Sequence, residues 1–255
     1  MIRVIVAGGC GRIGGEVARL ISKTKDMRLS GIIERTDHPE IGKMFSDTLV
    51  LSDISSLLDK SDVVVDFTSP QSLLSLLKKL KESSLPIISG TTGLTPDDLK
   101  ELKKHSENKA VLWSPNMSTG VNLLFKLVGQ AASSLKDYDI EILEMHHRHK
   151  KDAPSGTAKM LEEIVKRERR ITKTLYGREG LTGERDADEL AVLALRAGDI
   201  AGEHTIFFAT EGERLELTHR ASSRLAFAQG TLKAIRFIVG RPKGLYGYSD
   251  ILEEN

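Results

Sequence analysis

The 255-residue sequence has little of several residue types that mark specialised classes of protein. Its single cysteine, Cys10, cannot form a disulfide within the chain, which favours a reducing compartment, and a cytoplasmic location is expected. Aromatic residues make up 5% of the chain, so few side chains could stack on nucleic-acid bases. No stretch approaches the roughly 18 consecutive apolar residues of a membrane span, and the first residues do not read as a secretion signal.

Neither sign of charge is in excess, because 37 Lys and Arg residues stand against 36 Asp and Glu residues, for a formal net charge of +1. The chain as a whole therefore has no electrostatic bias toward nucleic acid or a membrane surface, and neither is expected as a partner. Any anion has to be bound by a local cluster of cations. The length is enough for one large domain or two modest ones.

The first half of the chain alternates short β-branched runs with helical patterns. The runs are apolar throughout, as in a sheet that is buried on both faces. This rhythm predicts an α/β fold with a Rossmann-type doubly wound parallel sheet. Strands are expected at 3–7, 29–33, 62–67, 85–90 and 110–114, and helices near 13–25, 55–60, 70–82 and 96–106, with Pro70 and Pro96 at helix starts.

After about residue 118 the pattern changes, and an inserted α+β domain with a mixed or antiparallel sheet is expected. A long last helix, apolar on one side, needs a surface to cover and could return to the first domain. We assign residues 1–118 and 227–255 to a dinucleotide-binding domain and residues 119–226 to a substrate-binding domain. The expected elements are helices at 121–135, 157–170 and 227–240 and strands at 138–145, 189–196, 202–210 and 213–221.

The segment VAGGCGRIGG follows the first expected strand and opens the first helix. Gly9, Gly11 and Gly14 satisfy G-x-G-x-x-G, and with Gly8 they also contain G-x-x-G-x-x-G. Glycine permits positive φ and a close approach to a pyrophosphate, while the helix N-terminus presents free N–H groups. Glu34 lies twenty residues beyond Gly14 at the end of the second strand, where its carboxylate could bond a ribose hydroxyl. A dinucleotide site is therefore predicted.

Arg35 follows Glu34, and the two leave the choice between cofactors open. A carboxylate favours the free 2′-hydroxyl of NAD, whereas an arginine can bind the 2′-phosphate of NADP or simply be a solvated surface residue. Three later loops have small residues that could approach a nicotinamide, although each alone also fits an ordinary turn. They are DFTS (66–69), SGTTG (89–93) and WSPNMS (113–118).

The stretch EMHHRHKKDAPSGTA (144–158) holds three of the seven histidines and two lysines. A metal site is disfavoured and none is expected, because Arg148, Lys150 and Lys151 would repel a divalent cation and the spacing has no clean ligand pattern. A nucleic-acid site would need a broader basic field. The possible metal ligands in the stretch are Glu144, His146, His147 and His149.

A small anion fits this stretch better than a metal or a nucleic acid, with a solvated loop as the plain alternative. Ser155 or Thr157 can cap a new helix whose first N–H groups face a carboxylate. Lys150 adds a point charge, and the histidines add proton donors that titrate near neutral pH. Because neighbouring strand residues point to opposite faces, His146 and His147 could both face a ligand only if the strand ends there.

With five further segments, this stretch resembles the 4-hydroxy-tetrahydrodipicolinate reductase family, also called dihydrodipicolinate reductase, of bacterial and plant lysine synthesis. The family pattern Glu-x-His-His-x-x-Lys-x-Asp-Ala-Pro-Ser-Gly-Thr-Ala is matched throughout. One departure is Met117, where the family often has Phe; it alters packing near the nicotinamide and leaves the assignment intact. The further segments are GRIG (11–14), SGTTG (89–93), PNMSTGVN (115–122), RAGDIAGEHT (196–205) and GERLELTHRASSR (212–224).

The resemblance implies that NADPH or NADH gives a hydride to a cyclic, unsaturated dicarboxylate, with net loss of water, to yield tetrahydrodipicolinate. It implies His146 as the acid–base group, Lys150 as a second proton donor, and a homotetramer built through the sheet of the second domain. It implies that His147, Gly156 and Thr157 hold a substrate carboxylate. The implied cofactor residues are Gly8, Gly9, Cys10, Gly11, Arg12, Ile13 and Gly14 at the pyrophosphate, Glu34 and Arg35 at the adenosine ribose, and Gly90, Thr91, Thr92, Ser114, Pro115, Asn116 and Met117 at the nicotinamide.

Two other functions stay open from the sequence. Another amino-acid-pathway dehydrogenase of this architecture, such as a relative of aspartate or homoserine dehydrogenase, would keep the glycine loop but would not need the histidine and Pro-Ser-Gly-Thr motifs together. A redox-sensing NAD(P)-binding regulator would be expected to carry a DNA-binding element or a basic face, and the sequence shows neither. The preference for NADH or NADPH is undecided, and Arg148, His149 and Lys151 have no assigned role.

Overall fold

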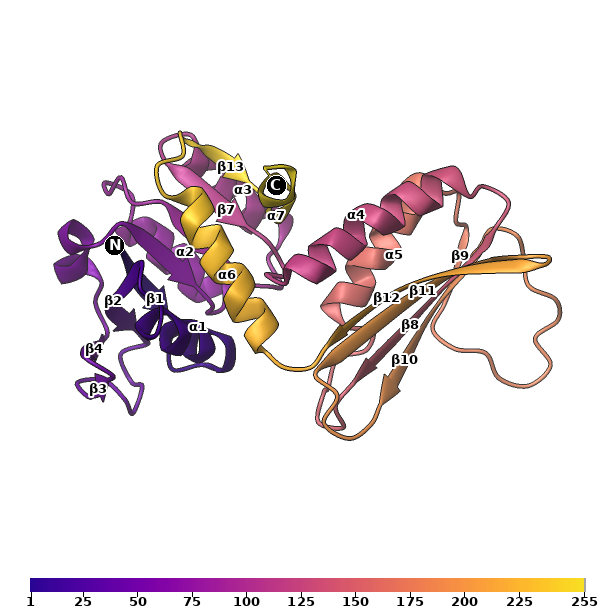
Figure 1. The fold of residues 1–255 in the computed structure, drawn as a ribbon, viewed down its shortest axis with the longest axis horizontal. Coiled ribbons are helices and arrows are strands. Elements are labelled where there is room, and N and C mark those ends of the chain that lie inside the picture. The colour runs from indigo at the N-terminus through magenta and orange to yellow at the C-terminus, as the bar shows by residue number, and fades with distance from the viewer. Residues whose placement is uncertain (255) are drawn as a thin grey trace. The chain divides into compact units, whose positions relative to one another are not determined.

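A computed structural model describes residues 1–254 and divides the chain into two compact units (Figure 1). The first unit comprises Met1–Thr119 and the chain from Arg224 onward, and the second comprises Gly120–Ser223. The boundaries expected from the sequence lay after residues 118 and 226. The chain thus leaves the first unit once and returns to it.

The first unit is built on an eight-stranded sheet in the order β13-β7-β6-β5-β1-β2-β4-β3. Every pairing in it is parallel except the one between β3 and β4, which confirms the Rossmann-type class. The strands are β1 (Ile2–Ala7), β2 (Met27–Ile33), β3 (Met44–Phe45), β4 (Thr48–Leu51), β5 (Val63–Asp66), β6 (Ile87–Ser89), β7 (Ala110–Trp113) and β13 (Gly244–Tyr246).

Helices cover both faces of this sheet, so that it is doubly wound. The core on one face joins Val4 and Val65 of the sheet to helices α1 and α6, and the core on the other joins Ile5 and Val64 to η1, α2 and α3. This alternation along β1 and β5 follows from the two-residue period of a strand. The helices are α1 (Arg12–Ser22), η1 (Ser55–Lys60, a 3₁₀ helix), α2 (Pro70–Lys79), α3 (Pro96–Ser106), α6 (Leu225–Ile238) and α7 (Tyr248–Glu253).

The two expected proline helix starts are confirmed, and each has a side-chain cap in front of it. Ser69 accepts a hydrogen bond from the Ser72 amide at 3.3 Å, with Pro70 as the first helical residue. Thr95 and Asp98 form a reciprocal capping box before α3. Proline suits this position because its missing N–H has no partner there in any helix.

Helix α6, which was expected at 227–240, packs beside α1 in the first unit. Its apolar residues Leu232 and Ile235 enter the same core as α1, and Arg236 forms an ion pair with Asp26 at 2.8 Å. The following strand, β13, adds to the edge of the sheet beside β7. The apolar side of α6 thus covers the same sheet face as α1.

The second unit contains a five-stranded sheet in the order β12-β11-β8-β10-β9. It is mixed, because β8 pairs in parallel with β10 but antiparallel with β11, so a wholly antiparallel sheet is excluded. Both helices pack on one face, over Ile142, Val192 and Ile206. The elements are α4 (Thr119–Ser134), β8 (Asp139–His146), α5 (Gly156–Glu168), β9 (Lys173–Leu175), β10 (Glu189–Arg196), β11 (Gly202–Thr210) and β12 (Glu213–Ala221).

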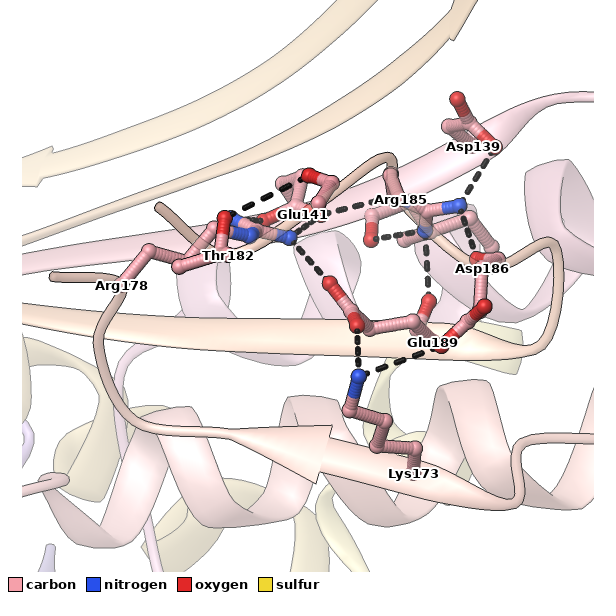
Figure 2. A network of polar contacts seen from close by, with 10 residues as sticks. Asp139, Glu141, Lys173, Arg178, Thr182, Arg185, Asp186 and Glu189 are labelled. Atoms are coloured by element: carbon pink, nitrogen blue, oxygen red, sulfur yellow. Dashed lines mark hydrogen bonds and ion pairs between the residues drawn. The ribbon is translucent and has the colours of Figure 1, made fainter. Parts of the chain in front are cut away.

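An ion-pair network ties the long connection between β9 and β10 to this sheet (Figure 2). Arg178 binds Glu141 of β8 at 2.8 Å and Glu189 of β10 at 2.6 Å. Arg185 binds Glu141 at 3.0 Å and Asp139 at 2.5 Å. The connection is polar and has no apolar run that could anchor it, so these ion pairs hold it in place.

No helix within residues 1–254 is both long and apolar enough to cross a bilayer.

Candidate functional site

The glycine loop in the first unit is shaped by close backbone approaches that exclude any side chain. Gly8 has a φ of 76°, and a Cβ there would lie 2.5 Å from the carbonyl oxygen of Phe67. A Cβ at Gly14 would lie 2.2 Å from the carbonyl oxygen of Gly8. Gly11 is the N-cap of α1, so the loop delivers the chain directly into the helix N-terminus. The loop therefore offers a pyrophosphate both a backbone that it can approach closely and the free N–H groups of a helix N-terminus.

A cavity of about 480 Å³ lies beside this loop. Its wall includes Gly8, Cys10 and Gly11 of the loop together with Glu34 and Arg35 just after β2. Further small and hydroxyl residues come from the loop after β5 and from α2. Three of the predicted pyrophosphate residues and both predicted ribose residues thus line one hollow, whereas Gly9, Arg12, Ile13 and Gly14 do not line it. The loop, the helix end and the hollow fit a dinucleotide.

The carboxylate of Glu34 is linked to the glycine loop. Its Oε1 accepts a hydrogen bond from the Cys10 amide at 2.8 Å. Burial and the charge of Glu34 raise the pKa of the Cys10 thiol to about 11, so the thiol is neutral at pH 7 and is a poor nucleophile. The guanidinium of Arg35 is 70% exposed and pairs with Asp37 at 3.1 Å. Within the loop, Arg12 is exposed, whereas Ile13 packs against the core.

A buried carboxylate, Asp66, joins the loops at the carboxyl edge of the sheet. It ends β5 and accepts hydrogen bonds from Thr68 Oγ1 at 2.5 Å, Ser89 Oγ at 2.7 Å and Thr91 Oγ1 at 2.7 Å. Burial raises the pKa of Asp66, against the lowering effect of these hydrogen bonds. Asp66 was not itself predicted as a site residue, although it begins the DFTS loop (66–69). The signal was an acid at the end of a fully apolar strand, where a carboxylate needs partners.

The residues predicted on the nicotinamide side do not line the cavity beside the glycine loop. The Thr91 side chain is bound to Asp66, Thr92 is exposed, and Gly90 lies where a Cβ would be 2.3 Å from the ring of Phe67. The backbone of residues 89–91 is thus fixed from within the first unit.

The loop after β7 is fixed mostly by its own hydrogen bonds. Ser114 Oγ donates to the carbonyl of Asn116 at 2.7 Å, and Asn116 Oδ1 accepts from the Ser118 amide at 2.8 Å. Met117 as a whole is 1% exposed, and its side chain belongs to the hydrophobic core, so no part of it is open to a cofactor in this structure. Gly230 of α6 allows this fit, because a Cβ there would lie 1.7 Å from the Met117 carbonyl oxygen. Pro115 is partly exposed in the same loop.

In the second unit, His146 is the last residue of β8 and is buried. Its Nδ1 lies 2.5 Å from Oε2 of Glu144, which is fully buried. Burial raises the pKa of Glu144, but the hydrogen bonds from His146 and Arg196 outweigh it and lower the pKa to about 2. Glu144 is therefore a charged carboxylate at neutral pH. His147 follows the end of the strand and is partly exposed.

His204 on β11 is a second buried histidine beside His146. The two rings meet edge to face with centroids 5.3 Å apart, and Nε2 of His204 lies 3.0 Å from Ser155 Oγ. Burial, followed by the charge of His146, lowers the pKa of His204 to about 3, so its ring is neutral. Neither His204 nor Arg196 was predicted as a site residue, although both fall in the segment RAGDIAGEHT. Arg196 lies opposite His146 and His204 lies opposite Glu144 on the neighbouring strands. The sequence does not show which strands are neighbours, so these contacts could not be predicted.

The turn after β8 carries Lys150 and leads into α5. The ammonium of Lys150 lies 2.8 Å from both carboxylate oxygens of Asp152, and its side chain is 19% exposed. Ser155 caps α5 by accepting from the Ala158 amide at 3.2 Å. Gly156 is the first residue of the helix and is exposed, and Thr157 follows it. His146, Lys150 and the start of α5 thus belong to one folded segment of the second unit.

Among residues 1–254, no three His, Cys, Asp or Glu side chains are arranged to hold a metal ion. In the histidine-rich stretch, Glu144 is committed to His146 and Arg196, and His149 is exposed. The chemistry that this stretch offers is an imidazole held by a carboxylate, a nearby ammonium group and a helix N-terminus. Such a set can move a proton and bind an anion.

Comparison with known proteins gives two family matches that cover nearly the whole chain. A model described as dihydrodipicolinate reductase, N-terminus, matches residues 2–117, and one described as dihydrodipicolinate reductase, C-terminus, matches residues 120–252. A relative from Syntrophus aciditrophicus named 4-hydroxy-tetrahydrodipicolinate reductase is 41% identical over 264 residues, covering 99% of this chain and 98% of the relative. A relative of the same name from Methanocaldococcus jannaschii is 41% identical over 270 residues, covering 100% of this chain and 98% of the relative.

A solved structure agrees with these matches. The dipicolinate-bound dihydrodipicolinate reductase from Paenisporosarcina sp. TG-14 superimposes with a TM-score of 0.82 at 26% identity. The alignment covers 98% of this chain and 99% of the other. Both units are therefore represented in that structure.

Proposed function

The chain belongs to the dihydrodipicolinate reductase family, and we propose that His146 and Lys150 carry the proton chemistry of its reaction. That reaction is the reduction of 4-hydroxy-tetrahydrodipicolinate to tetrahydrodipicolinate with NADH or NADPH, a step of lysine and diaminopimelate biosynthesis. The observation that carries the function is identity of about 41% over the full length of relatives with this activity in their name.

The cofactor side of the reaction is assigned to the first unit. When bound, the nicotinamide supplies the hydride that reduces C4 of the substrate ring. The amides of residues 8–14 bind the pyrophosphate, and Glu34 and Arg35 bind the adenosine ribose with its 2′-hydroxyl or 2′-phosphate. The loops at 90–92 and 114–117, fixed by Asp66 and by their own hydrogen bonds, lie on the nicotinamide side.

The substrate side is assigned to the segment between β8 and α5. A dicarboxylate needs cationic and N–H partners, and His147, Gly156 and Thr157 hold one carboxylate at the helix start. Loss of water and gain of a hydride leave one proton to be supplied, which His146 or Lys150 donates as the ring becomes electron-rich. Asp152, which holds Lys150 at 2.8 Å in the structure, competes with the substrate carboxylate for the same ammonium.

We also propose a homotetramer built through the sheet of the second unit, in the cytoplasm. Strand alternation puts Leu143, Met145, Leu193, Leu195 and Phe207 on the face opposite α4 and α5. Leu195 is 49% exposed there, and a sheet with a spare apolar face suits a second copy of the chain. The single cysteine supports a reducing compartment.

The direct test is NADPH oxidation with freshly generated 4-hydroxy-tetrahydrodipicolinate. Lys150→Ala is expected to lose most turnover, by about 100-fold or more, while NADPH affinity is kept, because the lysine is placed on the substrate side. Lys151→Ala is the matched control, since Lys151 is an exposed neighbour in the same turn. Full turnover by Lys150→Ala would contradict its role. Tight NADPH binding without turnover in the unaltered protein would favour a regulator instead.

A further inference from the structure

Glu144 is a buried carboxylate that the reaction as described so far does not use. It lies two residues before His146 on β8, and alternate residues of a strand share a face, so both side chains point to the same side of the sheet. The side chain of Glu144 has no exposed surface. A buried charge of this kind is stable only when its oxygens are fully paired.

Four hydrogen bonds satisfy this carboxylate. Oε2 lies 2.5 Å from Nδ1 of His146 and accepts from Nη1 of Arg196 at 2.9 Å. Oε1 accepts from Nη2 of Arg196 at 2.8 Å and from the Ser155 amide at 3.0 Å. The bidentate arginine fixes the plane of the carboxylate, and the Ser155 amide ties it to the N-terminus of α5. The oxygen that faces His146 therefore has little freedom to move.

This geometry determines which nitrogen of His146 carries the proton. An ionised carboxylate can only accept a hydrogen bond, so Nδ1 must be the donor. Nε2 is then the nitrogen left for other partners. It lies beside Gly202 of β11, where a Cβ would be 3.0 Å from it, so glycine keeps space open at that nitrogen.

We propose that Glu144 is a positioning residue that holds the Nδ1 proton of His146 and leaves Nε2 to exchange protons with the substrate. The inference rests on the proposed role of His146 as the acid–base group. In the proton transfer the Nε2–H bond breaks and the proton passes to the substrate, while the Nδ1–H bond to Glu144 stays intact. Glu144 thus stabilises the charged imidazole before transfer and fixes its orientation throughout.

The groups around His146 are compatible with this arrangement. Across the sheet, β10 contributes the guanidinium of Arg196 and β11 contributes the neutral ring of His204. Arg196 also donates from Nη2 to the carbonyl of Asp152 at 2.7 Å, and Asp152 holds Lys150. Arg196 therefore connects the carboxylate behind His146 to the turn that carries the second proposed proton donor.

The test is Glu144→Gln, a substitution that keeps the shape of the side chain and removes its charge. We expect kcat to fall by about 100-fold or more with an unchanged KM for NADPH, as general acid–base groups contribute about 10²–10⁴-fold. In the variant protein with ¹⁵N-labelled histidine, the Nδ1–H signal of His146 is expected to give way to a mixture that includes the Nε2–H tautomer. A role in folding alone would not move that signal in a folded protein.

Glu141→Gln is the matched control. Glu141 is on the same strand and is also paired with arginines, but it binds Arg178 and Arg185 on the opposite face. It should leave both kcat and the His146 signal unchanged. Equal loss of kcat in the two variants would overturn the inference, because it would mean that any broken ion pair on β8 has this effect.

His146→Gln separates this inference from the proposed function. If His146→Gln is inactive while Glu144→Gln keeps wild-type kcat and tautomer, the positioning role is wrong and the role of His146 stands. If His146→Gln turns over normally, the role of His146 fails and Glu144 has nothing to position.

Should Glu144→Gln fail to fold, Glu144→Asp supplies the same test. It keeps the charge for Arg196 and withdraws the oxygen from His146 by one methylene. The expected result is again lost kcat and a lost Nδ1–H signal, and wild-type kcat with that signal lost would refute the role.

Discussion

Mild acid is expected to destabilise the second unit through protonation of His204. The side chain is 3% exposed, and its pKa is lowered to about 3 by burial and by the charge of His146. Its Nδ1 is buried and has no hydrogen-bond partner among residues 1–254. A second N–H and a positive charge would therefore enter a site that has no acceptor for them.

The sign and size of the effect follow from the two pKa values of His204. The folded pKa of about 3 lies below the ordinary histidine pKa of 6.5, so the unfolded chain binds the proton more readily. Stability is complete above about pH 6.5 and falls progressively as the pH drops toward about 3. At about 1.4 kcal/mol per pH unit, the free energy of unfolding should lose about 2 kcal/mol at pH 5 and at most about 5 kcal/mol below pH 3.

The assay is urea unfolding at pH 7.5 and pH 5.0, with the two units followed separately. The only tryptophan, Trp113, lies in the first unit, so its fluorescence reports on that unit, while hydrogen exchange of the β8 and β11 amides reports on the second. The variant His204→Gln should remove most of the pH-dependent loss from the second unit. His149→Gln, an exposed histidine in the same unit, should leave the loss as it is. Equal losses in wild type and His204→Gln would refute the reasoning.

Two further predictions concern the glycine loop and the open sheet face. Gly14→Ala puts a Cβ 2.2 Å from the Gly8 oxygen, so the loop must shift, and the NADPH Kd measured by calorimetry should rise about tenfold. Gly177→Ala is the control, because a Cβ there meets nothing within 4 Å. An unchanged Kd for Gly14→Ala would contradict the strain argument. Leu195→Asp should reduce the mass measured by light scattering from that of a tetramer to that of a smaller assembly. Leu181→Asp, in an exposed loop, is the control and should leave the mass unchanged. A tetramer in both variants would place the interface elsewhere.

The glycine loop and the histidine stretch could be identified from the sequence because their signals are local. A Cβ at Gly14 collides with a carbonyl six residues earlier, and a turn that tight leaves a fixed glycine spacing in the chain. The order and apolar character of β1, β2, β5, β6 and β7 could also be predicted from a local signal, because a strand that is buried on both faces appears in the sequence as a continuous apolar run. The strands β3, β4 and β13 were not predicted, because Val50 is the one buried residue among them and no continuous apolar run marks them.

The positions that the sequence left open depend on contacts between residues far apart in the chain. Asp66 is paired with hydroxyls from the next strand of the sheet, and Glu144 with an arginine 52 residues later. A sequence period shows which face of a strand is buried, but it does not show which strand lies alongside or in what register. For the same reason, the helix expected at 227–240 could be recognised from its apolar side, yet only the folded core decided that α6 covers the same sheet face as α1.

The sequence by itself determined the family, the cofactor loop and the residues that can move a proton, because each is a chemical type at a fixed local spacing. The tertiary structure alone decided how those residues are held. The sequence identifies His146 as a candidate acid–base residue. The strand register places Glu144, Arg196 and His204 around it, and this arrangement decides which of its ring nitrogens is free to exchange a proton. Hydrogen bonds between neighbouring strands leave no local pattern in the sequence, so the contacts around His146 are visible only in the folded structure.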